Sequence, residues 1–155
     1  VSAMGVRPQA GEFNRGFGLH FSMTDPTQFV YFADFPVPPS SHGNKIYDGL
    51  GGFSCGDAET ECVQMISVLR GNSVALLCGE LGPAQVASFQ GGCPSGHDEL
   101  SAVDIVFLRP DPDAAIFGES GGVLKEYGNA KIRVRSVVDH ERTISVWTTG
   151  QVTVQ

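Results

Sequence analysis

The chain has 155 residues, a net charge of −7, 20 glycines, nine prolines and a charged fraction of only 17%. This length suits one domain, spanning residues 1–155, that buries a core of its own. The ten basic residues form no run, so we expect no nucleic-acid surface, which needs a basic patch. No apolar stretch approaches the length of a membrane span, so we expect no membrane insertion.

The N-terminal third predicts an irregular arm, two strands and a long loop. Residues 1–11 are interpreted as the arm. A half-buried strand follows, because apolar side chains alternate with small or polar ones at Phe17, Leu19, Phe21 and Met23. Residues 29–35 are apolar on both faces, which indicates a central strand or one covered from both sides. Residues 36–52 are the longest irregular stretch, and their Tyr47 could reach a ligand.

The middle of the chain contains short apolar runs separated by glycine, proline and cysteine. The clearest predicts a strand with Val103, Ile105 and Phe107 on one face. Before it, two strands are expected on either side of Gly71 and Asn72, although the first also fits a short helix. The expected elements are, in order, strands at 62–70, 73–78 and 84–89, a turn at 91–97, strands at 103–109 and 114–117, and an ambiguous run at 123–127.

Residues 130–154 predict an antiparallel meander of three strands. β-Branched residues alternate with polar ones in three runs, which are Ile132 and Val134, Ile144 and Val146, and Val152 and Val154. Residues 139–141 and Gly150 mark the two reversals, because short polar residues and glycine favour turns.

The spacing of strands and turns predicts the fold class. Short strands separated by turn signals every eight to twelve residues or so are typical of all-β sandwiches and barrels. We therefore expect a single-domain, all-β, antiparallel sandwich of the jelly-roll type, or a closed barrel. A mixed α+β fold is the main alternative.

Four cysteines suggest a disulfide framework. Cys55 and Cys62 bracket a short loop, and Cys78 and Cys93 bracket a longer one, although four cysteines allow three pairings. Disulfides would indicate an oxidising setting, which means an extracellular, secreted or particle-surface protein. The alternative is four reduced thiols. A zinc site is not expected, because no cysteine or histidine spacing fits one.

The segment 118–122 reads GESGG, and it fits the G-x-S-x-G pattern that exposes a nucleophilic serine on a tight turn. It also resembles the GDSGG loop of trypsin-like proteases. The other triad positions fit poorly, because Asp104, with His42 or His97 before it, lies too close to Ser120 for a second barrel. We therefore interpret the segment as a glycine-rich turn and keep catalysis by Ser120 as the alternative.

Trp147 is the only tryptophan, and strand periodicity places it on the polar face with Thr143 and Ser145. A hairpin would bring this face near Arg133 or Arg135, depending on the register. An indole beside guanidinium groups suits a sugar ring or a partner protein. We therefore hypothesise a recognition patch of these three residues. The alternative is that a second sheet or the N-terminal arm covers the indole.

These patterns favour a non-enzymatic recognition or surface domain that binds a glycan or a protein receptor. It would be a lectin-like module or the exposed domain of a capsid or cell-surface assembly. The alternatives are a small serine hydrolase that uses Ser120, and a structural subunit that forms a homo-oligomer. The acidic loops and the four histidines lack ligand spacing, so we expect neither a metal nor a cofactor. The ligand-binding candidates are Trp147, Arg133, Arg135 and Tyr47.

Overall fold

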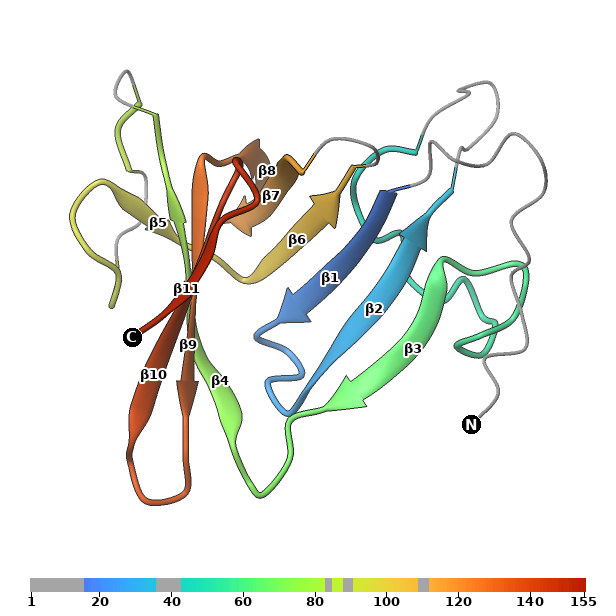
Figure 1. Cartoon of the computed structure of the whole chain (residues 1–155), viewed down its shortest axis with the longest axis horizontal. Coiled ribbons are helices and arrows are strands. Elements are labelled where there is room, and N and C mark those ends of the chain that lie inside the picture. Colours follow the sequence, from blue (N-terminus) through green and yellow to red (C-terminus); the bar gives the residue numbers. More distant parts are fainter. Residues whose placement is uncertain (1–15, 36–42, 83–84, 88–90, 109–111) are drawn as a thin grey trace.

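The computed structural model describes residues 16–35, 43–82, 85–87, 91–108 and 112–155, which form eleven β-strands and no helix. The strands make two antiparallel sheets that pack against each other as the two layers of a β-sandwich (Figure 1). The predicted all-β sandwich is therefore confirmed. The barrel alternative is not realised, because the sheets remain separate. The α+β alternative is wrong for the described residues, because no helix covers either sheet.

The larger sheet has six strands in the order β3-β2-β1-β6-β7-β8. Their bounds are β1 Gly16–Ser22, β2 Gln28–Asp34, β3 Cys62–Ser67, β6 Ala102–Phe107, β7 Ala114–Ser120 and β8 Val123–Glu126. Strands β1 and β6 are far apart in the chain but neighbours in the sheet. This pairing brings the N-terminal hairpin β1–β2 alongside the hairpin β6–β7.

The smaller sheet has five strands in the order β11-β10-β9-β4-β5. Their bounds are β4 Ser73–Glu80, β5 His97–Glu99, β9 Asn129–Arg135, β10 Glu141–Trp147 and β11 Val152–Val154. The predicted C-terminal meander is thus confirmed as β9–β10–β11. Its reversals place Asp139 at φ 59° and Gly150 at φ 77°, a left-handed conformation that Asp and Gly tolerate better than most residues.

Three connections cross between the sheets, namely β3–β4, β5–β6 and β8–β9. The two strands expected around Gly71 and Asn72 both form, but β3 pairs with β2 and β4 pairs with β9. The turn between them is therefore a crossing rather than a hairpin. Residues 85–87 belong to no strand, and the rest of the possible strand at 84–89 lies outside the described residues, as does the expected arm at 1–11.

The main core lies between the sheets and takes side chains from both. Its fully buried members include Leu77 and Ile132 from the smaller sheet and Ile105 and Ile116 from the larger one. A second cluster lies on the outer face of the larger sheet. There Val30, Phe32, Cys62 and Val106 are buried beneath Tyr47, Leu50 and Cys55. Strand β2 is thus covered on both faces, as its unbroken apolar sequence predicts.

Candidate ligand-binding site

The register of β9 and β10 builds a polar surface on the outside of the smaller sheet. Alternate residues such as Ile132 and Val146 point into the core, so their neighbours point outward. The outward residues face each other in four antiparallel pairs, which are Asn129 with Trp147, Lys131 with Ser145, Arg133 with Thr143, and Arg135 with Glu141. Lys131 and Arg133, the cations of the two middle pairs, are half-buried.

A hollow of about 150 Å³ opens on this face. Strand β4 supplies Leu76 and Cys78, and the strands β9 and β10 supply the polar part. The lining residues are Leu76, Cys78, Pro94, Lys131, Arg133, Thr143, Ser145 and Gln155. The hollow therefore combines two cations, two hydroxyl groups and an amide with a small apolar surface.

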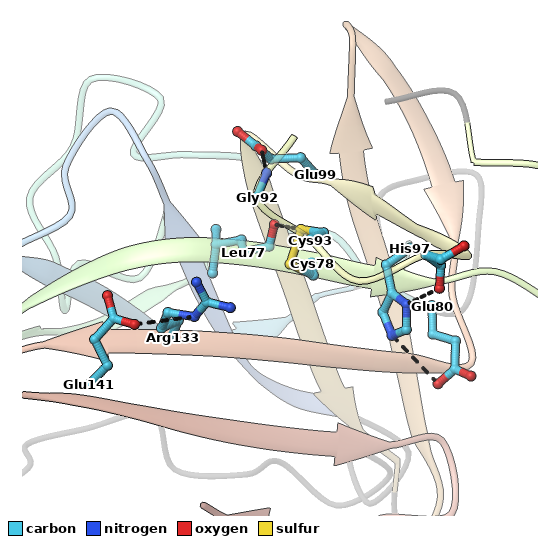
Figure 2. Close-up of a disulfide and its surroundings, with 10 residues drawn as sticks. Leu77, Cys78, Glu80, Gly92, Cys93, His97, Glu99, Arg133 and Glu141 are labelled. Carbon is cyan, nitrogen blue, oxygen red and sulfur yellow. Dashed lines mark hydrogen bonds and ion pairs between the residues drawn. A yellow bond between two sulfur atoms is a disulfide. The ribbon is translucent and has the colours of Figure 1, made fainter. Parts of the chain in front are cut away.

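The Cys78–Cys93 disulfide ties one wall of the hollow to its floor. It joins β4 to the turn before β5, with the two Cα atoms 5.8 Å apart. The turn is held a second time, because the Gly92 amide donates a 2.9 Å hydrogen bond to Oε2 of Glu99 (Figure 2). Pro94 follows Cys93 directly and lines the hollow. The position of this wall therefore depends on the disulfide.

Arg133 and Arg135, the two arginines of β9, differ in how closely they bind Glu141. Arg135 donates two hydrogen bonds to Oε1 of Glu141, at 2.9 Å from Nε and 2.7 Å from Nη2. This pairing raises the pKa of Arg135. Arg133 approaches the same carboxylate only through Nε, at 3.8 Å from Oε2 (Figure 2). Glu141 thus binds Arg135 more closely, and among the described residues the terminal nitrogens of Arg133 have no recorded hydrogen bond.

The structure separates the three residues of the hypothesised patch. Arg133 and Arg135 share the outer face with Trp147, as the periodicity predicts. Trp147 is half-buried opposite Asn129, four positions along β10 from Thr143, which is about 13 Å of extended strand. Only Arg133 of the three lines the hollow.

Tyr47 lies on the opposite side of the sandwich. Its ring packs 5.0 Å from the ring of His20 and 5.4 Å from that of Phe32, on the outer face of the larger sheet. Burial and the nearby carboxylate of Glu61 raise the pKa of its phenol. One small ligand cannot contact both Tyr47 and Arg133, so the predicted ligand-binding residues fall into two separate regions.

The region around Tyr47 contains a histidine–carboxylate pair that the sequence pattern did not reveal. Nδ1 of His20 lies 2.7 Å from Oδ1 of Asp104, across the β1–β6 pairing. Burial raises the pKa of Asp104, although the bond to His20 and the backbone N–H of Tyr47 oppose this shift. A carboxylate on Nδ1 leaves Nε2 as the proton acceptor, which is the geometry of a general base. No hydroxyl or thiol group among the described residues bonds to His20.

Ser120 does not occupy the position that a nucleophile needs. It ends β7, and the Gly121–Gly122 turn that follows, with φ values of 59° and 78°, leads directly into β8. Its side chain is 3% exposed, and Oγ has no hydrogen-bond partner in the described part of the chain. The GESGG segment is therefore a β-hairpin turn. Asp104 bonds to His20 rather than to His97, while His42 lies outside the described residues.

Both expected disulfides form, Cys55–Cys62 as well as Cys78–Cys93, and no described cysteine is free. This pairing is compatible with an extracellular location. Within the described ranges, no three histidine, cysteine or acidic side chains gather closely enough to hold a metal ion.

Part of the hollow was visible in the sequence and part was not. Strand periodicity alone places Lys131, Arg133 and Arg135 on one face of the strand, although Lys131 was not among the predicted ligand-binding residues. Pro94 and Gln155 carry no such signal, because only the disulfide and the course of β11 bring them to this face.

Nowhere in the described part of the chain does a helix occur that is long and apolar enough to span a membrane. Comparison of the chain with protein-family models, with curated proteins and with solved structures finds no match, so inference about function rests on the geometry of the site.

Proposed function

We propose that this domain is a non-enzymatic recognition module that binds a glycan through the outer face of its smaller sheet. The observation that carries the proposal is the hollow itself, in which Lys131 and Arg133 stand beside the hydroxyl groups of Thr143 and Ser145. Side chains with several hydrogen-bonding groups on a rigid sheet suit the many hydroxyl groups of a sugar. The two disulfides of the domain favour an extracellular or particle-surface setting.

The size of the hollow indicates how such a ligand would bind. Its volume of about 150 Å³ is well below the 300–1,000 Å³ or so of pockets that enclose a whole drug-sized molecule. The hollow would therefore hold one terminal group of a larger ligand, while the remainder extends over the neighbouring surface. Trp147 lies on that surface and offers an indole face to a longer chain.

Screening on a glycan array followed by NMR tests this proposal. Amide signals of β4, β9 and β10 are expected to shift on titration with the best ligand, while those of β1 and β2 stay in place. Arg133→Gln should weaken binding, whereas Arg142→Gln should not. Arg142 is exposed and directly precedes Thr143 on β10, so its side chain points to the opposite face of the sheet from the hollow. The two Arg→Gln variants change the net charge equally. Shifts confined to the larger sheet would assign the ligand to the other face and contradict the proposal.

A second candidate function, a structural subunit that self-associates, is favoured by the edge of the smaller sheet. Among the described residues, strand β11 pairs only with β10, and its Val152 and Val154 are 52% and 66% exposed. An open edge with apolar side chains can add a strand from another copy. Light scattering should then show an oligomer that Val154→Lys dissociates. A monomer at all concentrations would remove this candidate.

A further inference from the structure

The hollow has a local charge opposite to that of the whole chain. The chain carries a net charge of −7, yet the only lining residues with ionisable side chains, Lys131 and Arg133, are cations. Of the acidic side chains on the neighbouring strands, Glu141 binds Arg135 and Glu99 accepts a hydrogen bond from the Gly92 amide. A negative ligand group would therefore meet complementary charge here, in contrast to the acidic average of the protein.

The two cations have few internal partners that would compete with a ligand. Lys131 makes no hydrogen bond or ion pair within the described residues, and Arg133 reaches Glu141 only at 3.8 Å. Both side chains are half-buried, so part of their hydration is already lost. An anion that binds between them gains charge-assisted hydrogen bonds and competes only with the long 3.8 Å ion pair between Arg133 and Glu141. Arg135 on the same strand is the contrast, because Glu141 already occupies its guanidinium group.

The neutral part of the lining fits the group that would carry such an anion. The hydroxyl groups of Thr143 and Ser145 and the amide of Gln155 can bond to sugar hydroxyls beside the charge. Leu76 and Pro94 supply apolar contact for the ring. The disulfide between Cys78 and Cys93 keeps this wall in place before the ligand arrives, which reduces the entropy lost on binding.

We propose that the hollow recognises the acidic group of a glycan, a carboxylate or a sulfate, held between Lys131 and Arg133. This inference depends on the proposed function and specifies its ligand. A carboxylate would take the forked donors of Arg133, with Lys131 as the second charge, and a sulfate would use the same atoms. Neutral sugars would satisfy the hydroxyl contacts but leave both cations unpaired.

Calorimetric titration with four matched chondroitin tetrasaccharides tests the proposal. The unsulfated form carries carboxylates only, the sulfated form carries both groups, and the carboxyl-reduced sulfated form carries sulfates only. The carboxyl-reduced, unsulfated form is neutral. Binding of at least one acidic form about tenfold or more above the neutral form is expected, and it should weaken as salt is raised. The single-group forms distinguish the two anions.

Variants of the two cations assign the binding to the hollow. Lys131→Gln and Arg133→Gln should each weaken binding of the acidic form by about tenfold to a hundredfold, the usual range for a hydrogen bond to a charged group. Arg133→Lys retains the charge but loses the fork, so it should fall between Arg133→Gln and the wild type. Arg142→Gln is the matched control and should bind normally, and circular dichroism should show every variant folded.

The outcomes separate this inference from the proposed function. If the neutral tetrasaccharide binds as tightly as the acidic ones, recognition of the anion is wrong, while glycan binding stands. If none of the four binds, the acidic-glycan inference is overturned, and the array and NMR experiment decides the proposed function independently. If Arg142→Gln weakens binding as much as Arg133→Gln, general charge rather than the hollow is responsible.

Discussion

The hydroxyl group of Tyr127 donates a 2.9 Å hydrogen bond to Oδ2 of Asp98, between the two sheets and out of contact with solvent. Nζ of Lys125 lies 2.9 Å from the same oxygen. Burial and the carboxylate both raise the pKa of Tyr127, because each disfavours the phenolate. Its ring fills space that two glycines leave open, Gly79 in the smaller sheet and Gly118 in the larger. This packing links the sheets at the end where β4, β5, β7 and β9 meet.

Gly79→Ala should destabilise the fold, because a Cβ there would lie 2.5 Å from the ring of Tyr127. Overpacking of this kind typically costs about 1–3 kcal/mol. Urea unfolding measures the loss. Gly82→Ala is the control, since a Cβ at Gly82 meets no described residue within 4 Å and its φ is not in the left-handed region. Equal losses of stability in the two variants would show that the backbone freedom of glycine, rather than contact with Tyr127, explains why a glycine occupies position 79.

Three buried carboxylates should make stability fall as pH rises above the acidic range. Burial raises the pKa values of Asp34, Glu61 and Asp104 above their ordinary ones. Each group therefore contributes stability that is fully present below its unfolded pKa, near 4, and is lost as pH rises through the higher folded value. Thermal unfolding of the wild type, followed from about pH 4 upward, should show the decline.

Asp34→Asn should flatten this pH dependence, because an amide cannot ionise but still accepts the 3.0 Å hydrogen bond from the Lys45 amide. Its stability relative to the wild type should improve as pH rises. Asp139→Asn, in the exposed β9–β10 turn, changes the net charge equally and serves as the control. If the stability of Asp34→Asn falls with pH as steeply as that of the wild type, the Asp34 carboxylate does not contribute to the pH dependence.

The two disulfides should differ in their effect on ligand binding. Replacing Cys78 and Cys93 by alanine releases a loop of 15 residues and should cost about 3 kcal/mol, with a clear loss of glycan binding as the Pro94 wall loosens. Replacing Cys55 and Cys62 releases 7 residues and should cost about 2 kcal/mol, with no effect on binding. Affinity is compared at a temperature where both variants are folded. Equal loss of affinity in the two would show that the wall does not shape the site.

Ser120→Ala should leave the fold intact or stabilise it by up to about 1 kcal/mol, because Oγ is buried with no described hydrogen-bond partner. Chemical unfolding gives the difference. The wild type should also resist labelling by a serine-reactive fluorophosphonate. Labelling that disappears in Ser120→Ala would revive the hydrolase alternative and would require the β7–β8 hairpin to open.

The sequence by itself determined the local features of this protein. Alternation with period two located β1, β6 and the β9–β10–β11 meander and told the inner from the outer face, because successive side chains of a strand must point to opposite sides. The unbroken apolar run of β2 showed that both its faces would be covered. The placement of Trp147 on the polar face, with Arg133 and Arg135 across the hairpin, followed from the same rule.

Only the tertiary structure decided which distant segments meet. Strands β3 and β4 flank a short turn yet belong to different sheets, since β3 pairs with β2 and β4 pairs with β9. His20 and Asp104 are 84 positions apart, and no periodicity links them. Trp147 and Arg133 share the outer face, but hairpin register places them four positions apart along the strands. The hollow exists because one of three possible cysteine pairings brings Pro94 over Lys131 and Arg133, a long-range contact that no local pattern specifies.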